Sequence, residues 1–143
     1  MGTFITMSAP RTPPVVLIAE DFEDARELYR DYLEFSGFQV LTASNGREAI
    51  ARAAELQPDL ILMDASMPVL DGWQATRLLK ANPATRHIPI VALTAHAFDD
   101  AKQQAKAAGC DAFITKPCLP DDLVSQVRSV LDGGMRRKPR PRG

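Results

Sequence analysis

The sequence predicts a single α/β domain built on a doubly wound, five-stranded parallel sheet. Five short apolar segments alternate with five segments whose apolar residues recur at helical spacing. The apolar segments contain almost no charge, which is typical of strands that are covered on both faces. Because the chain has 143 residues, it fits one domain. Right-handed crossovers leave few ways to wind such an alternation.

Each expected strand is bounded by turn residues or by charges. The five segments are 15–19, 38–41, 60–63, 88–93 and 112–115. Two prolines precede the first of them, and Glu20 and Asp21 follow it. The third ends at Asp64. The fourth is entered through Pro89, at a position where a missing N–H group is tolerated.

The expected helices follow these strands and have recognisable ends. Asp21 occupies an N-cap position for the first helix, and Gly37 occupies its stop position. Gly109 is expected to end the fourth helix, and Gly133 and Gly134 to end the last one. The apolar residues expected to face inward include Phe22, Leu28 and Leu78.

The two ends of the chain differ from its body. Residues 1–13 lack apolar periodicity and are expected to form a disordered arm before a domain at 14–132. Residues 133–143 are expected to form a disordered basic tail, because five basic residues fall within the last eight. Without these five, 12 basic residues face 18 acidic ones, so the body is acidic. An acidic body argues against direct binding of nucleic acid.

Composition also bears on the cellular compartment. No stretch approaches the roughly 20 apolar residues that a membrane span needs, and the N-terminus lacks the pattern of a signal peptide. Cys110 and Cys118 have no metal-ligand spacing and are expected to be free thiols. These features predict a cytoplasmic protein with no membrane contact.

Polar groups follow four of the five expected strands. They are Glu20 with Asp21, Asp64, Thr94 and Lys116. The carboxyl ends of parallel strands meet at one edge of a sheet, so these side chains are expected to converge. Three carboxylates in one pocket repel one another unless a cation lies among them, and Mg²⁺ suits such oxygen ligands. A lysine and a hydroxyl could then hold a phosphoryl group while Asp64 acts as a carboxylate nucleophile.

Several motifs together resemble the response-regulator receiver family. They are Val-Val-Leu-Ile-Ala-Glu-Asp at 15–21, Asp-Leu-Ile-Leu-Met-Asp-Ala-Ser-Met-Pro at 59–68, Asp-Gly at 71–72, Ile-Val-Ala-Leu-Thr-Ala at 90–95 and Phe-Ile-Thr-Lys-Pro at 113–117. They occur in the family's order and at similar spacing over residues 14–131. The resemblance implies the strand order 2-1-3-4-5.

The resemblance also implies a magnesium site, with Mn²⁺ as an alternative ion. Asp21 and Asp64 would bind the metal directly, the main-chain carbonyl of Ser66 would be a further ligand, and Glu20 would act through water. Glu20 stands where many members have Asp, and Ser66 where many have Asn. A longer carboxylate can still reach a water molecule, and a backbone ligand survives the second change.

The remaining implied roles concern the phosphoryl group. Asp64 would accept it, Thr94 and Lys116 would contact it, and Phe113 would be the aromatic residue whose rotation follows the switch. The bond between Lys116 and Pro117 is expected to be cis, which proline permits at modest cost.

A phosphorylation-dependent signalling switch of a two-component or phosphorelay system follows from this resemblance. The donor would be a sensor histidine kinase or a histidine phosphotransfer protein. A downstream protein would bind the face formed by the fourth helix, fifth strand and last helix. Self-catalysed phosphotransfer and slow self-dephosphorylation would be the only reactions, so the chain is not expected to be a dedicated enzyme.

Other functions are weighed against this one. A metal-binding scaffold without phosphotransfer and a receiver excised from a hybrid histidine kinase remain open. An aspartate-nucleophile phosphatase usually has a second acid two residues after the nucleophile, where this chain has Ser66. A flavodoxin-like electron carrier would place a phosphate-binding loop after the first strand, where this chain has two acids.

Overall fold

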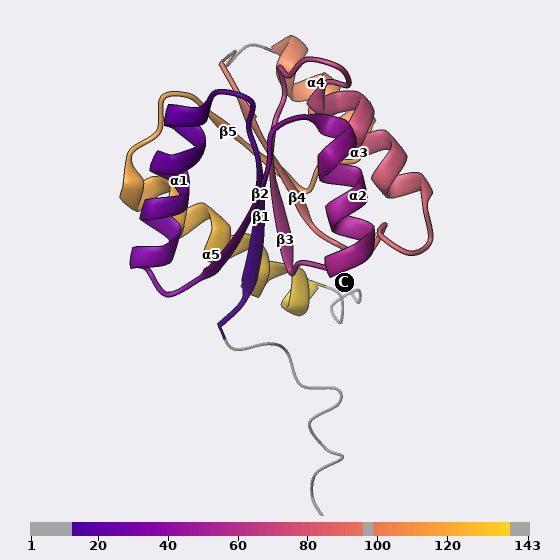
Figure 1. Ribbon diagram of the computed structural model, residues 1–143. Helices are drawn as coiled ribbons and strands as arrows, with labels where there is room; N and C mark the ends of the chain where they lie inside the picture. Colours follow the sequence, from indigo (N-terminus) through magenta and orange to yellow (C-terminus); the bar gives the residue numbers. More distant parts are fainter. Residues whose placement is uncertain (1–12, 96–98, 138–143) are drawn as a thin grey trace, which may run out of the picture.

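The computed structural model describes residues 13–95 and 99–137. Strands and helices alternate strictly along this part of the chain (Figure 1). The strands are β1 (Val15–Ala19), β2 (Gln39–Ala43), β3 (Leu60–Asp64), β4 (Ile90–Thr94) and β5 (Ala112–Thr115). The helices are α1 (Glu23–Phe35), α2 (Gly46–Leu56), α3 (Gly72–Ala81), α4 (Asp99–Ala108) and α5 (Pro120–Arg137). No helix in these two ranges is both long and apolar enough to cross a membrane.

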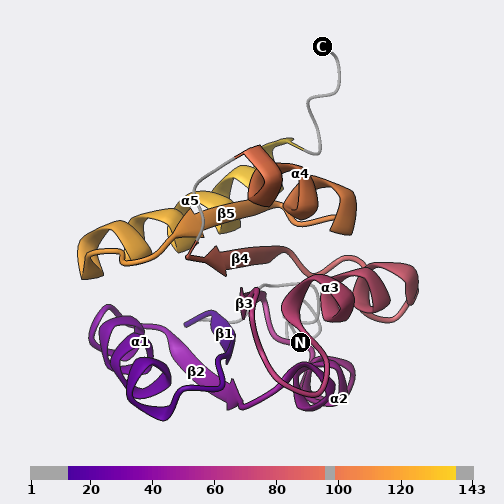
Figure 2. The ribbon, with the colours of Figure 1, turned by 90° about the horizontal axis from the view of Figure 1, so that it is seen from above.

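All neighbouring strands are parallel, and their order is β2-β1-β3-β4-β5. Helices α1 and α5 cover one face of the sheet, and α2, α3 and α4 cover the other (Figure 2). The predicted doubly wound fold and strand order are therefore confirmed.

Two hydrophobic cores fill the space between the sheet and its helices. Alternate residues of a strand point to opposite faces, so Val16 and Ile18 of β1 enter one core while Leu17 and Ala19 enter the other. Both sets are buried, which is why the central strands are continuous apolar runs rather than alternating ones. The first core contains Leu33 from α1, Val127 from α5 and their neighbours.

The register of the paired strands determines how far along the sheet each polar residue lies. Ala19 is the register partner of Met63, so Glu20 and Asp64 follow at the same height. Asp64 in turn pairs with Leu93, directly before Thr94. The sheet therefore delivers the polar groups that end its strands to one edge.

Strands β2 and β4 differ from the prediction by one or two residues at each end. Strand β2 runs to Ala43 rather than to residue 41, because its ladder with β1 continues until β1 itself ends. Strand β4 begins at Ile90 rather than at residue 88. Pro89 precedes this strand, and its carbonyl oxygen accepts a hydrogen bond from the N–H group of Ile61.

The start and the inner face of α1 were predicted wrongly. Phe22, not Asp21, is the N-cap residue, and no side chain caps this helix. Phe22 and Leu28 are exposed, and in α3 Leu78 is exposed as well. A helix on a sheet buries only a narrow stripe, and in α1 its fully buried members are Tyr29 and Leu33.

The predicted end of the last helix is also wrong. Gly37 and Gly109 follow α1 and α4 with φ angles of 98° and 96°, as helix-stopping glycines do. Helix α5 instead continues past Gly133 and Gly134 to Arg137. Glycine lowers helix stability by about 1 kcal/mol relative to alanine but does not forbid the helix. The rest of the expected tail, 138–143, and residues 1–12 of the expected arm lie outside the described residues.

Helix α2 begins with cap hydrogen bonds that link Ser44, Asn45 and Glu48. The side chain of Asn45 accepts from the N–H group of Glu48 at 2.8 Å, and the Glu48 carboxylate accepts from the N–H group of Ser44 at 2.7 Å. The hydrogen bond from Ser44 lowers the pKa of Glu48 below its ordinary value. The Glu48 carboxylate thus binds the residue before the N-cap, in a variant of the capping box.

We predict that Glu48→Ala destabilises the protein at neutral pH by up to about 1 kcal/mol, since the group is partly exposed. A lowered folded-state pKa means that the charged group contributes stability above its unfolded pKa of 4.5 and loses that contribution as the pH falls through the folded value. Urea unfolding from pH 7 to pH 3 should therefore show the difference from wild type shrinking. Glu55→Ala, an exposed change in the same helix, is the control and should show no such trend.

Candidate functional site

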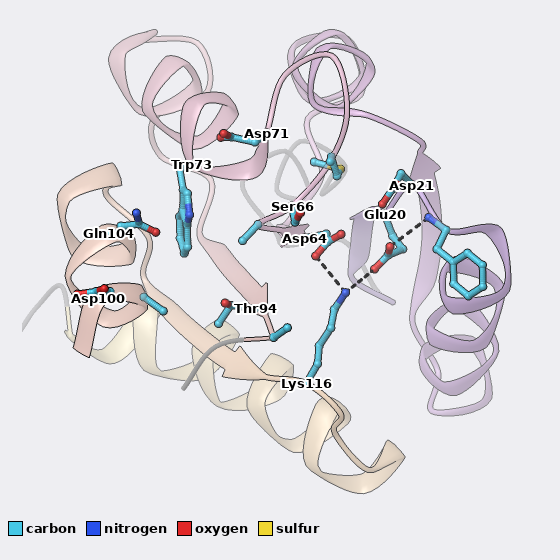
Figure 3. Close-up of a pocket in the computed structure, with 15 residues that line it drawn as sticks. Glu20, Asp21, Asp64, Ser66, Asp71, Trp73, Thr94, Asp100, Gln104 and Lys116 are labelled. Carbon is cyan, nitrogen blue, oxygen red and sulfur yellow. Dashed lines mark hydrogen bonds and ion pairs between the residues drawn. The ribbon is translucent and has the colours of Figure 1, made fainter. Parts of the chain in front are cut away.

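Three carboxylates meet at the carboxyl edge of the sheet. Glu20 and Asp21 follow β1, and Asp64 ends β3 (Figure 3). Each offers an oxygen atom, and these atoms all lie within 4.8 Å of one another. Glu20 is only 1% exposed and Asp64 only 4%, whereas Asp21 is open to solvent. Water therefore screens the repulsion between the two buried acids poorly.

Lys116, just after β5, lies between the two buried acids. Its Nζ atom donates to Asp64 Oδ1 at 3.0 Å and to Glu20 Oε1 at 3.2 Å. Burial by itself lowers the pKa of Lys116, but its bonds to Asp64 and Glu20 outweigh burial and raise that pKa above the ordinary value. The lysine therefore stays charged and holds two acids from different strands together.

Glu20 is held at both carboxylate oxygens. Besides Lys116, it accepts a hydrogen bond from the N–H group of Phe22 at 3.1 Å. Burial, followed by the negative charge of Asp64, raises the pKa of Glu20 despite these two bonds. When all three carboxylates are ionised, the single positive charge of Lys116 leaves this cluster net negative.

The donor set fits a divalent cation. Carboxylate oxygens are the ligands that Mg²⁺ prefers, and one solvent-exposed acid leaves room for the water molecules that this ion retains. Ser66 lines the same pocket, next to the strand end that carries Asp64. An added positive charge here would also relieve the repulsion that the two buried acids exert on each other.

The structure brings together nearly all of the predicted site residues. Thr94 is buried and lines the pocket with the acids and Lys116. The peptide bond between Lys116 and Pro117 is cis, as expected. Phe113 alone is not a lining residue; it lies half-buried in β5, paired with Ala92.

The pocket extends further than the sequence indicated. Its far side is lined by Asp71 and Trp73 at the start of α3 and by Asp100 and Gln104 of α4. Trp73 projects toward the α4 side of the pocket (Figure 3). In the sequence, Asp71 stood out only as part of a motif, and nothing pointed to a role for Trp73. Helix α3 begins only a few residues after the end of β3, so its first turn lies near the pocket. This short separation in the sequence was the signal that Asp71 and Trp73 could reach the site.

The loop between β3 and α3 is fixed by two glycines that permit close backbone contact. A Cβ atom on Gly72 would collide with the carbonyl oxygen of Asp64. A Cβ atom on Gly46, at the start of α2, would collide with the carbonyl oxygen of Leu70 in the loop. Asp71 caps α3 by accepting from the N–H group of Gln74 at 2.9 Å. The pocket wall therefore rests on the first turns of two helices.

A strained turn lies at the middle of this loop. The N–H group of Leu70 donates to the carbonyl oxygen of Pro68 at 2.7 Å, which closes a three-residue γ-turn around Val69. The φ angle of Val69 is 70°, a region that β-branched residues rarely adopt. Such a conformation costs on the order of 1–3 kcal/mol.

We predict that Gly72→Ala lowers stability by about 2 kcal/mol or more, because the new methyl group must displace the backbone of Asp64. Mg²⁺ affinity should fall as well. Gly133→Ala is the matched control, since a Cβ atom there has nothing within 4 Å, and alanine is the better helix former. Urea unfolding and calorimetric Mg²⁺ titration of both variants test this. Equal stability and Mg²⁺ affinity in the two variants would contradict it.

The chain matches known proteins over nearly its whole described length. The family model for the response regulator receiver domain covers residues 16–128. The polar-differentiation response regulator DivK of Brucella anthropi is 39% identical over 119 residues, which cover 83% of this chain and 97% of that protein. DivK of Brucella ovis is 38% identical over 116 residues, which cover 81% of this chain and 94% of that protein.

Solved structures of receiver proteins are also similar to this chain. The chemotaxis protein CheY4 of Vibrio cholerae superposes with a TM-score of 0.78 at 31% identity, over 82% of this chain and 98% of its own. The receiver domain of a sensor histidine kinase from Pseudomonas aeruginosa, solved with a magnesium ion in its active-site cleft, has a TM-score of 0.78 at 30% identity, over 83% and 98% of the two chains. The receiver domain of a histidine kinase from Syntrophus aciditrophicus has a TM-score of 0.78 at 38% identity, over 84% and 91%. With the convergent site, these matches show that the chain belongs to the response regulator receiver family.

Proposed function

We propose that this receiver domain is a phosphorylation-dependent switch in which Asp64 accepts a phosphoryl group from a phosphohistidine. The donor would be a sensor histidine kinase or a histidine phosphotransfer protein. One observation carries the proposal: the Asp64 carboxylate ends a buried strand inside an acidic pocket, with a lysine ammonium 3.0 Å away. A carboxylate nucleophile with positive charge beside it is what phosphoryl transfer to aspartate requires.

In this proposal Asp21 and Asp64 bind Mg²⁺ directly, the carbonyl oxygen of Ser66 adds a ligand, and Glu20 acts through water. The clustering of three carboxylate oxygens within 4.8 Å supports the assignment. Mn²⁺ would be accepted as well, because it favours the same oxygen ligands. When bound, the ion would neutralise part of the charge on the phosphoryl oxygens.

The chain's own residues account for the rest of the transfer. An oxygen atom of Asp64 forms a bond to phosphorus as the bond between phosphorus and the histidine nitrogen breaks, and the imidazole leaves with that electron pair. Lys116 exchanges part of its contact with the two acids for a phosphoryl oxygen. The Thr94 hydroxyl donates to another. Slow hydrolysis of the aspartyl phosphate would reset the switch, and no other reaction is assigned.

The proposed output surface consists of α4, β5 and α5. Thr94 is the register partner of Thr115, and Phe113 lies two residues earlier on the same strand. A shift of Thr94 toward the phosphoryl group would let Phe113 turn inward. Helix α4 is held by small buried side chains, Ala101, Ala105 and Ala108, so moving it disrupts little packing. A downstream protein would bind this surface directly.

Two alternatives are kept beside the switch. The chain also resembles receiver domains that belong to histidine kinases, which favours a receiver cut from such a kinase as the second candidate. A scaffold that binds metal without accepting phosphate is the third. For all three we propose a cytoplasmic protein without direct contact to nucleic acid or membrane, in keeping with the acidic body of the chain.

We predict that incubation with Mg²⁺ and phosphoramidate adds the mass of one phosphoryl group, as measured by intact mass spectrometry. The adduct should require Mg²⁺ and should be absent in Asp64→Asn. Asp31→Asn removes an exposed acid outside the pocket and should label like wild type. A folded, Mg²⁺-binding wild type that never forms the adduct would favour the scaffold.

We predict that phosphorylation changes amide hydrogen exchange mainly in α4 and β5 and at the start of α5. Exchange in α2 should stay constant and serve as the internal reference. Loss of the Thr94 hydroxyl in Thr94→Ala should weaken the change in α4 even where Asp64 is still phosphorylated. Unchanged exchange in all three output elements would refute this choice of surface.

A further inference from the structure

Val69 combines a strained backbone with an exposed apolar side chain. Its φ angle of 70° lies where glycine and asparagine are favoured and valine is not. The side chain is 70% exposed, so burial within the described part of the chain does not compensate for the strain. Glycine or asparagine would relieve the backbone without loss of internal packing. The branched side chain therefore contributes little to this fold.

The position of Val69 at the edge of the pocket suggests a role in binding a partner. Met67 and Asp71, two residues to either side, both line the pocket that contains Asp64. The turn at Val69 therefore belongs to the loop that walls this pocket. The loops after β1 and β5 carry Phe22 and Leu119, which are 62% and 67% exposed. All three residues follow strand ends, and hence lie at the same edge of the sheet.

Exposed acids stand beside these apolar residues. Asp21, Glu23 and Asp24 flank Phe22, and Asp121 and Asp122 follow Leu119 at the start of α5. Any partner that covers this edge must accommodate negative charge. Charge complementarity favours a partner whose apolar patch is flanked by lysine or arginine side chains.

We propose that Val69 is a specificity-determining contact for the protein that donates the phosphoryl group, through an apolar patch next to the donor's phosphohistidine. Asp64 lies on the pocket floor and is only 4% exposed, so a donor protein must cover the pocket edge to bring phosphorus to its carboxylate. A small phosphodonor enters without touching Val69. This inference rests on the proposed function and adds a partner-selecting residue to it.

Three substitutions separate the contact from the strain. Val69→Asn removes the apolar side chain and reduces the strain. Val69→Thr keeps the branched shape and the strain but replaces a methyl group by a hydroxyl. Val69→Ile keeps both the strain and the apolar contact. Val69→Asn should raise the melting temperature by about 2–6 °C. The Thr and Ile variants should melt close to wild type.

Phosphotransfer is then measured with two kinds of donor. The protein donor is the autophosphorylated histidine kinase core that labels wild type fastest within a purified panel, and the small donor is phosphoramidate with Mg²⁺. The Asn and Thr variants should lose about tenfold in kcat/KM with the kinase, and the Ile variant should stay near wild type. All variants should react with phosphoramidate at the wild-type rate.

Several results would overturn the inference. Wild-type transfer from the kinase to Val69→Thr would show that the apolar contact does not matter. A parallel loss with phosphoramidate would show that the turn shapes the pocket rather than a docking surface. A wild-type dimer that Val69→Thr disrupts, seen by sedimentation, would assign the residue to a second copy of the chain. A wild type that takes phosphate neither from any kinase of the panel nor from phosphoramidate would instead refute the proposed function.

Discussion

The contact on which the site depends is the pair of hydrogen bonds that Lys116 makes to Asp64 and Glu20. These residues are separated by 52 and 96 positions in the sequence, and only the parallel register of the sheet brings them together. Two buried carboxylates this close would repel each other without a positive group between them. The lysine therefore stabilises the charged edge of the sheet and holds the carboxylate of the proposed acceptor, Asp64, at the pocket.

This arrangement leaves the cluster with too little positive charge, and that imbalance is useful. The raised pKa of Glu20 shows that burial and the charge of Asp64 outweigh the help from Lys116. A divalent cation would offset this excess negative charge, and only then would the site tolerate a phosphoryl group, which is itself anionic. A site balanced at neutrality would attract the cation less strongly. The fold thus keeps a charge imbalance in a rigid frame, with two packed cores behind it.

Much of this could be predicted from the sequence, because the signals were long-range consequences of simple rules. Apolar runs ending in Asp64, Thr94 and Lys116 predicted both the sheet and the convergence of these groups at its edge. Local details were less predictable. The N-cap residue of α1 is Phe22 and not Asp21, because the residues that follow β1 line the pocket. The N–H group of Phe22 donates a hydrogen bond to Glu20 there. Side chains near the edge of a helical stripe, such as Leu28, were assigned to the wrong side because periodicity does not give the width of the buried face.

Gly46 gives the β3–α3 loop a support that lies far from the chemistry. The first turn of α2 approaches the carbonyl oxygen of Leu70 so closely that no side chain fits between them. In a mutational scan this position would behave like a site residue although it lines no part of the pocket. Sensitivity to mutation in this chain is therefore a poor guide to which residues line the pocket. Part of the pocket's shape depends on the first turn of α2, a helix from which no lining residue comes.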